Sequence, residues 1–370
     1  MLINIFLIPF IIILGLLMSH RDNRRSRLSY ILVCSVVLVF VAAMRSPAWM
    51  TNTYNIDTLN YKDYFESYSE MSWNDLWQSF YIRYFTGGED FDIGYVALNK
   101  IIGIFTSEFY VFSLIADLLF FIPFGMILYR YCTRMRQLVF AFIFYISLIQ
   151  IFLLGGGRQM FSIGFDLMAL IAVVDRKKYL AILFFIIGTT IHFSSLLFLI
   201  PLLMVWYNIS PRVLKFMHLI CFIFFPLVLA MPNELIVFMG ETSGMEKYAD
   251  FGRGAIQGGA TTFVILIEVI SFICLITIKS KDIVVSRALQ IFYVMAPLLT
   301  FFAPLIRSNG SMIRISLYYH LFLVLLVPYA IDCAFKKRRE SSVAYFVAIG
   351  VLAALSLSNG GIQYYFFWER

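Results

Sequence analysis

The chain has 370 residues, of which 61% are hydrophobic and only 14% are charged. A soluble domain carries charge on roughly a quarter of its residues, so this composition excludes an ordinary soluble protein. The formal net charge of +7 does not indicate nucleic-acid binding, because the basic residues cluster in short loops between apolar runs. That distribution is the one that the positive-inside rule predicts for a multi-pass membrane protein.

The first two predicted crossings are residues 2–19 and 28–44, joined by an arginine-rich loop that we expect inside the cell. No basic segment precedes the first run and no small-residue cleavage site follows it, so we expect a retained helix rather than a signal peptide. The second helix leads into a polar segment at about 45–92 with an acidic excess and many Trp and Tyr residues. We expect this segment outside, at the membrane interface.

Residues 93–105 form an apolar run that is too short to span a bilayer comfortably. The basic loop at 129–137 should lie inside, which requires an odd number of crossings after residue 92. We therefore expect one crossing at about 109–128 and a re-entrant or interfacial helix at 93–105.

The remaining crossings are expected at about 138–154, 160–174, 213–231, 262–278, 288–305, 315–333 and 343–357, with two short helices within 179–207. The total is about twelve crossings with both termini outside. A second extracytoplasmic loop is expected at about 232–261. The sequence thus predicts an all-α polytopic membrane protein, organised as a single integral membrane domain over residues 1–370.

The five cysteines are scattered singly, in or near apolar runs, and they indicate neither a disulfide framework nor a metal site: Cys34, Cys132, Cys221, Cys274 and Cys333. Two acidic residues, Asp117 and Glu268, lie within predicted crossings. They fit either a proton or ion path or simple pairing with neighbours.

The stretch Gly155-Gly156-Gly157-Arg158-Gln159 lies between two apolar runs. An arginine cannot shed its charge and its fork matches a phosphate, while glycines let the backbone approach a ligand closely. The alternative is a polar turn whose arginine only reaches to the interface. Arg158, Ser162 and Asp166 share one helix face, which predicts a polar stripe into a cavity or, alternatively, an intrahelical salt bridge.

The predicted topology places unusual polar residues from at least five segments at the outer face: Arg45, Asp57, Asp92, Arg158, Gln159, His192, Arg307 and Arg314. His192 lies at a helix break among Ser and Thr residues and is a candidate general base, the alternative being a structural histidine. Arg307 and Arg314 flank a short outer turn, against the positive-inside trend. This placement suggests an anionic partner, and the alternative is that both side chains reach to the surface.

Several outward arginines with a histidine and a carboxylate suit a diphosphate leaving group. The arginines would neutralise the diphosphate as its bond breaks, and a base would take the proton of an attacking hydroxyl. No group has the spacing of metal ligands, so we expect a metal-independent reaction without a cofactor.

Five sequence motifs and a late arginine pair occur in a characteristic order: Met44-Arg45, Asn55-Ile56-Asp57-Thr58-Leu59-Asn60-Tyr61, Asp92-Ile93-Gly94-Tyr95, Gly157-Arg158-Gln159, Ile191-His192-Phe193-Ser194-Ser195, and Arg307 with Arg314. In this order the chain resembles the EpsG family of bacterial polysaccharide polymerases, also called Wzy-type polymerases. It departs from the family pattern at Asp92-Ile93-Gly94, where Glu-Pro-Gly is frequent, and at Ile56, where glycine is usual.

The resemblance implies a glycosyltransferase that joins undecaprenyl-diphosphate-linked oligosaccharide repeat units and releases undecaprenyl diphosphate. The reaction would occur at the outer, periplasmic face of the bacterial inner (cytoplasmic) membrane and would yield O-antigen of lipopolysaccharide, capsule or exopolysaccharide. The resemblance also leaves a GT-C-like glycosyltransferase architecture open.

The family's motifs suggest roles for individual residues. Arg158, Arg307 and Arg314 would bind the diphosphate, and His192 would be the base, with Asp57 as its substitute. Arg45 and Asp92 would shape a sugar-binding rim, and aromatic residues between Trp49 and Tyr84 could stack on sugars. Gln159 and Tyr61 complete the expected substrate-binding residues.

The expected partners are the lipid-linked donor and acceptor, the lipid bilayer, and a flippase and chain-length regulator proteins; no nucleic acid is expected. Two alternatives stay open. A flippase or transporter of the lipid-linked unit would use the same arginines without breaking a bond. A ligase of the O-antigen type would share the chemistry but use another acceptor. A flippase should need accessible sites on both faces, whereas the unusual charges here gather on one, which favours an enzyme.

Overall fold

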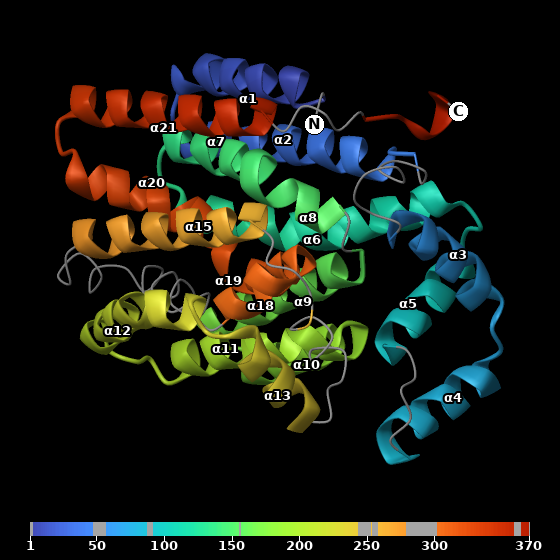
Figure 1. Cartoon of the computed structure of the whole chain (residues 1–370). Coiled ribbons are helices and arrows are strands. Elements are labelled where there is room, and N and C mark those ends of the chain that lie inside the picture. The colour runs from blue at the N-terminus through green and yellow to red at the C-terminus, as the bar shows by residue number, and fades with distance from the viewer. Residues whose placement is uncertain are drawn as a thin grey trace. The chain divides into compact units, whose positions relative to one another are not determined.

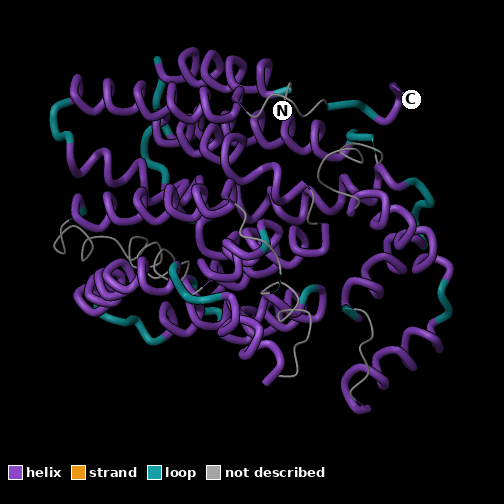
Figure 2. The backbone as a smooth tube through the Cα atoms, viewed as in Figure 1, coloured by secondary structure: helices purple, strands orange, loops and turns teal. Residues whose placement is uncertain are grey.

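The computed structural model describes residues 3–46, 57–86, 92–154, 157–242, 253, 258–278, 302–358 and 364–369. Within these ranges every regular element is a helix, as Figure 2 shows, apart from an isolated β-bridge between Arg45 and Phe366. The prediction of an all-α protein is confirmed.

The chain divides into two compact units, one formed by Met1–Leu202 with Ile349–Arg370 and the other by Leu203–Ala348. Each is described below by itself. That residues 1–370 form a single integral membrane domain stays a prediction.

The N-terminal part of the first unit contains α1 (Asn4–Ser19), α2 (Arg24–Ala43), α3 (Asp57–Glu70), α4 (Trp73–Tyr81), the π-helix η1 (Ile82–Thr86), α5 (Ile93–Gly103), α6 (Phe109–Tyr131), α7 (Met135–Phe144), the π-helix η2 (Tyr145–Ile149), α8 (Gln150–Leu154), α9 (Gly157–Val174), α10 (Lys178–Ile191) and the 3-10 helix η3 (Phe193–Phe198) (Figure 1). The 3-10 helix η6 (Phe367–Glu369) belongs to its C-terminal part. Helix α9 packs against both α6 and α10, and α6 packs against α2. Helix α5 packs against α3 and α10, so it connects the segment that contains α3 to the apolar helix α10.

Helix α11 (Leu199–Trp206) crosses from the first unit into the second. The second unit contains α12 (Pro211–Leu229), α13 (Asn233–Thr242), α15 (Gly258–Thr277), α18 (Ala303–Ser308), the 3-10 helix η5 (Gly310–Met312), α19 (Ile313–His320), α20 (Leu323–Ala334) and the first part of α21 (Arg338–Ser358). Helix α15 contacts α12, α18 and α20.

Seven helices within the described ranges are long and apolar enough to cross a membrane: Arg24–Ala43, Phe109–Tyr131, Met135–Leu154, Gly157–Val174, Arg212–Leu229, Gly258–Thr277 and Arg338–Ser358. The pair α19 and α20, bent by 48°, is a broken span or a re-entrant loop. These helices confirm a polytopic membrane protein.

The described helices support neither the count of about twelve crossings nor a GT-C-like architecture. A bilayer core of about 30 Å needs about 20 helical residues, at about 1.5 Å each. By contrast, α1 has 16 residues and α10 has 14. The short helix pair within 179–207 is present as α10 and Phe193–Trp206, each shorter than a full span. Most of the crossing expected at 288–305 lies outside the described residues.

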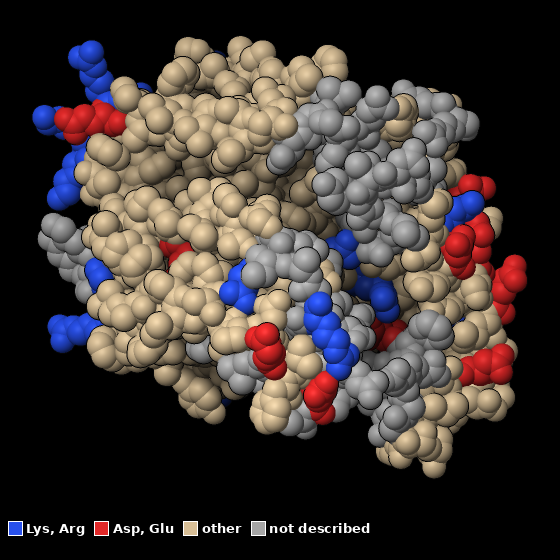
Figure 3. Space-filling view, in the orientation of Figure 1, with Lys and Arg blue, Asp and Glu red and all other residues tan. Residues whose placement is uncertain are grey.

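The segment at 45–92, which is predicted from the sequence to be an outer loop, is largely helical in its described part. Its described part contains α3 and α4, and acidic side chains gather over α3 and the turn that follows it (Figure 3). Tyr61, Phe65 and Tyr68 are buried, because their spacing places them on one face of α3. Similarly, α13 occupies part of the second predicted outer loop at 232–261.

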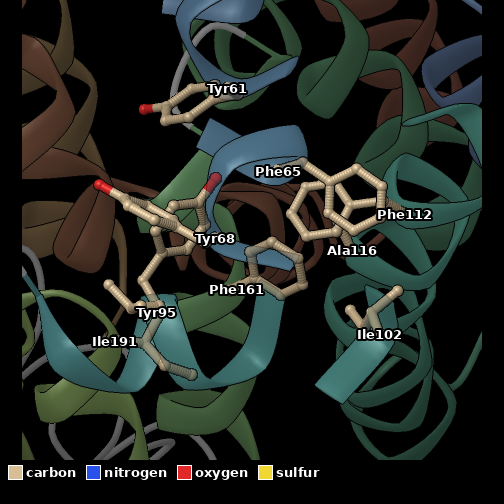
Figure 4. Packing of buried hydrophobic residues seen from close by; sticks show 10 residues of the cluster. Tyr61, Phe65, Tyr68, Tyr95, Ile102, Phe112, Ala116, Phe161 and Ile191 are labelled. Carbon is tan, nitrogen blue, oxygen red and sulfur yellow. The ribbon is translucent and has the colours of Figure 1, made fainter. Parts of the chain in front are cut away.

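A largely aromatic cluster in the core of the first unit packs between α3 and α5 (Figure 4). The rings of Phe65 and Phe112 stack with centroids 4.7 Å apart, and Tyr95 meets Phe161 edge-on at 6.2 Å. These contacts join α3, α5, α6 and α9. They give the short helices α3 and α5 a fixed position against long apolar helices.

Candidate active site

Two side chains from distant parts of the first unit, Arg158 and His192, meet at the carboxylate of Asp92. Its Oδ2 atom accepts a hydrogen bond from the Arg158 NH1 group at 3.3 Å and lies 3.1 Å from Nδ1 of His192. The side chains are 11%, 31% and 30% exposed for Asp92, Arg158 and His192. One carboxylate oxygen therefore bridges the guanidinium and the imidazole in a partly sheltered setting.

Asp92 occupies the N-cap of α5, with extended backbone angles of φ −62° and ψ 98°. An N-cap aspartate usually accepts from the backbone of the first helical turn. Here the side chain makes no such bond and reaches Arg158 and His192 instead. The residue thus gives up a stabilising cap, which indicates a role outside the helix itself.

His192 stands at the break between α10 and η3, where the backbone is extended at φ −152° and ψ 116°. A buried contact holds this break against α9, because the Ser195 hydroxyl donates to both carboxylate oxygens of Asp166 at 2.7 and 2.8 Å. Ser162 on α9 donates to the carbonyl of Gly188 at 3.1 Å. Ser162 and Asp166, two members of the predicted polar stripe on α9, therefore form hydrogen bonds with the neighbouring segment that contains α10 and η3. Asp166 bonds Ser195 rather than pairing with Arg158.

The contact between Asp92 and His192 depends on a close approach of α5 to α10 at Gly94. A Cβ atom on Gly94 would lie 2.4 Å from Oγ1 of Thr190 and 2.8 Å from the backbone nitrogen of Ile191. No larger residue fits without separating the helices. Because Gly94 has no side chain, α5 and α10 come close enough for the Asp92 carboxylate to reach His192.

Arg158 lies in the first turn of α9, beside two tyrosines. The Tyr61 ring covers Gly157, where a Cβ would come within 3.0 Å of the ring carbons. The guanidinium carbon lies 5.8 Å from the centroid of the Tyr95 ring, within the range of a cation–π contact. Burial raises the pKa of Tyr95, so its phenol stays protonated.

Arg45 is buried and joins two helix ends of the first unit. Its NH1 group donates to the carbonyl of Ala42, and its NH2 group donates to the carbonyl of Leu154 at 3.1 Å. Leu154 ends α8, just before the stretch that carries Arg158. In the structure Arg45 is a helix-capping side chain, and its expected place at a sugar-binding rim stays a prediction.

The late arginines belong to the second unit. Arg307 donates to the carbonyls of Leu229 and Met231 at 2.6 and 2.5 Å and to Oδ1 of Asn233 at 2.8 Å. Both of its terminal nitrogens thus satisfy acceptors at the end of α12 and the start of α13. Arg314 is half-buried in the second turn of the helical segment that η5 begins. That these two arginines bind a diphosphate stays a prediction.

The other sequence-predicted residues have mixed outcomes. Tyr61 joins Arg158 and Asp92 in the first unit, and Gln159 is buried in α9. Asp57 begins α3, but the description of the structure does not extend to its side chain, and Trp49 lies outside the described residues. Of the predicted site residues, Tyr61, Asp92, Arg158 and His192 are brought together. The roles assigned to all of these residues stay predictions.

Two features of the site are missing from the sequence analysis. Tyr95 beneath the guanidinium has no assigned role there, although it lies three residues after Asp92 and hence one helical turn along the same face. Likewise, no signal in the sequence pairs Ser195 with Asp166, because the two residues are 29 positions apart.

The arrangement suits proton transfer beside an anion. When Asp92 is ionised its carboxylate only accepts hydrogen bonds, and the proton of this contact then lies on Nδ1 of His192. In the neutral imidazole Nε2 is then an acceptor and can take a proton. Within the described residues, no group of three or more His, Cys, Asp or Glu side chains is placed to hold a metal ion.

The fold and this cluster define a multi-pass, all-α membrane protein with an Arg–Asp–His group in its first unit. The EpsG family model matches residues 36–365, which is nearly the whole chain, and the chain belongs to the EpsG family. Members of this family are Wzy-type polymerases, so membership suggests a polysaccharide polymerase of the glycosyltransferase type. No curated protein and no solved structure matches the chain.

Proposed function

We propose that this protein is a polysaccharide polymerase that acts on oligosaccharide repeat units linked to undecaprenyl diphosphate. The growing glycan is transferred from its lipid carrier onto a hydroxyl of a new repeat unit, and undecaprenyl diphosphate is released. The reaction takes place at the outer face of the bacterial inner membrane. Family membership supports the polymer-forming activity. The acidic excess of the segment at 45–92, and the basic residues in the loops predicted to lie inside the cell, support the orientation.

The observation that carries the proposed mechanism is the bridging position of Asp92 between Arg158 and His192. The Asp92 carboxylate orients the imidazole and fixes its tautomer, as the carboxylate of a catalytic triad does. His192 Nε2 accepts the proton of the attacking hydroxyl. Arg158 offers a charged fork for the diphosphate, and its contact with Asp92 holds it in place before the substrate arrives.

In bond terms, the acceptor oxygen forms a bond to the anomeric carbon of the donor glycan as the bond from that carbon to the diphosphate oxygen breaks. The electron pair of the broken bond goes to the diphosphate, whose growing charge Arg158 stabilises. The hydroxyl proton goes to His192 and then leaves to water. The reaction requires no oxidant or reductant, and metal independence is part of the proposal.

A deletion strain tests the function through the gel ladder of its surface polysaccharide. We expect the strain to carry single repeat units on the final acceptor, and the natural gene to restore long chains. When the His192→Gln or Arg158→Lys variant is expressed in the deletion strain at the level of the natural protein, we expect that long chains are not restored. A matched control is Arg130→Ala, because Arg130 forms a similar ion pair with Asp175 at 2.7 and 3.2 Å elsewhere in the same unit.

The ladder also separates the alternatives. Full ladders from both His192→Gln and Arg158→Lys would contradict the site assignment. Loss of all surface glycan from the deletion strain, single repeat units included, would contradict the polymerase and would support a flippase or a ligase.

A further inference from the structure

An aromatic stripe runs along α4 and η1 on the surface of the first unit. It consists of Trp73, Trp77, Tyr81 and Phe85, spaced four residues apart and therefore on one side of the helical segment. All four are exposed, with Trp77 at 63% and Phe85 at 68%. Helix α4 contains no buried residue, so the stripe is not covered by the protein that the structure describes.

Helix α4 divides sharply into an apolar and a polar side. Leu76 and Phe80 extend the aromatic stripe on one flank, and Leu76 packs against the core beneath it. Asn74, Asp75 and Gln78 are exposed on the remaining side. Such a division is typical of a helix that lies flat at an interface between an apolar and an aqueous phase.

The apolar surface continues onto the end of α5. There Ile101, Ile104 and Phe105 are exposed, Phe105 at 81%. Helices α4 and α5 are in contact, and the Lys100 ammonium on α5 lies 5.0 Å from the centroid of the Trp73 ring. Four residues after Phe105 the membrane-spanning helix α6 begins. The exposed surface of α4 and α5 therefore leads along the chain directly to a lipid-facing helix.

We infer that the aromatic stripe and the exposed end of α5 lie in the outer interface of the lipid bilayer. Trp and Tyr prefer the headgroup level, where their rings meet apolar tails and their polar atoms meet water. A glycan would stack on the aromatic rings but has no preference for the aliphatic Ile101 and Ile104. An apolar patch of this kind on a water-exposed surface would promote aggregation, whereas a lipid interface accommodates both its aromatic and its aliphatic residues.

This placement has a consequence for the site. Helix α5 begins at the Asp92 N-cap, so anchoring α4 and α5 at the interface fixes Asp92 relative to the lipid headgroups. This consequence rests on the proposed function only in that a lipid-linked diphosphate lies at the same level. The anchoring itself is tested without any activity measurement.

Depth-dependent fluorescence quenching tests the inference. Trp77 is kept as the single tryptophan by changing Trp49, Trp73, Trp206 and Trp368 to Phe, and the protein is reconstituted in phosphatidylcholine–phosphatidylglycerol vesicles. We expect a large loss of Trp77 emission when the lipid acyl chains are brominated near the headgroup. Aqueous iodide should quench it little.

The matched control moves the probe to the polar side of the same helix. With the other four tryptophans again changed to Phe, Trp77→Phe combined with Gln78→Trp makes residue 78 the single tryptophan. Its emission should be quenched by iodide and little by brominated lipid. If the single-tryptophan protein does not fold, quenching is measured on the natural protein and on Trp77→Phe. The difference between their quenched emissions then gives the contribution of Trp77. The inference is overturned if Trp77 responds to iodide alone, or if neither quencher reaches it, the result expected for a cover of protein or glycan.

Discussion

At the scale of single residues, Asp92 determines how the other two groups of the site are held. Asp92→Asn keeps the volume of the side chain but replaces a charged acceptor with an amide that can donate to Nδ1 of His192. That donation would reverse the tautomer and leave the proton on Nε2, where a base is needed. We expect turnover to fall by roughly 10²- to 10⁴-fold, the usual range for general acid–base groups.

The measurement is initial rate at saturating donor, with Asp175→Asn as the control. Asp175 pairs with Arg130 at an exposed position, so its substitution should leave the rate near that of the natural protein. A fully active Asp92→Asn protein would mean that the carboxylate does not orient the base.

Tyr95 provides a second prediction at the residue scale, because its ring, rather than its hydroxyl, faces the guanidinium of Arg158. Tyr95→Phe keeps the ring and should raise the KM for the donor by no more than about threefold. Tyr95→Leu removes the cation–π contact, typically about 0.5–2 kcal/mol, and should raise KM by roughly 2- to 30-fold. Equal KM values for the two variants would remove the ring contact from the account.

At the scale of elements, the approach of α5 to α10 is set by Gly94. Gly94→Ala introduces a Cβ at 2.7 Å from the carbonyl carbon of Thr190, and backbone cannot move aside as a flexible side chain can. We expect a loss of about 1–3 kcal/mol in stability and a loss of activity as Asp92 moves away from His192.

Gly350→Ala is the matched control for this variant, since no atom outside the adjoining backbone of α21 lies within 4 Å of the added methyl group. Alanine is the better helix former, so this change should stabilise the protein by up to about 1 kcal/mol. Thermal unfolding in detergent measures both. Equal melting temperatures for Gly94→Ala and the natural protein would contradict the tight helix contact.

Arg45 supports a further element-scale prediction, because it caps the ends of α2 and α8. Arg45→Lys can keep only one of the two carbonyl contacts and should cost about 1–3 kcal/mol in stability. If capping is its main task, the folded variant retains the natural donor KM. A raised KM at unchanged melting temperature would instead support its predicted place at a sugar-binding rim.

At the scale of the whole molecule, orientation in the membrane follows from the charges of the loops. Asn74 on α4 should face the outside and Lys177, in the basic turn before α10, the inside. In intact cells a membrane-impermeant maleimide should therefore label Asn74→Cys but not Lys177→Cys. Permeabilised cells should show both labelled. Labelling of Lys177→Cys alone in intact cells would reverse the topology.

Much of this architecture could be predicted from the sequence, because apolar runs and basic loops are local signals. They indicated the long helices α2, α6, α9 and α15 and the short α5. The described helices do not support the count of about twelve crossings, since an apolar run such as that of α10 signals burial without fixing whether the helix spans the bilayer. The buried face of α3 was missed, although Tyr61, Phe65 and Tyr68 follow helical spacing.

The candidate site was predictable only in part. Arg158 and His192 were recognised because a charge or a histidine at the end of an apolar run is costly and needs a reason. Asp92 was expected at the same face, but its contacts with both residues could not be predicted, because it lies 66 and 100 residues away from them in sequence. Contacts over such separations depend on packing, here on the space that Gly94 leaves, and no local pattern encodes them.

The most direct test of the account is a reaction with purified protein in vesicles, with a synthetic repeat unit on undecaprenyl diphosphate as both donor and acceptor. The natural protein and Arg130→Ala should release undecaprenyl diphosphate in step with glycan elongation. His192→Gln and Arg158→Lys should each release it at least about 10²-fold more slowly. Elongation at the natural rate by either of these two variants, or movement of the lipid across the membrane without release, would contradict the account.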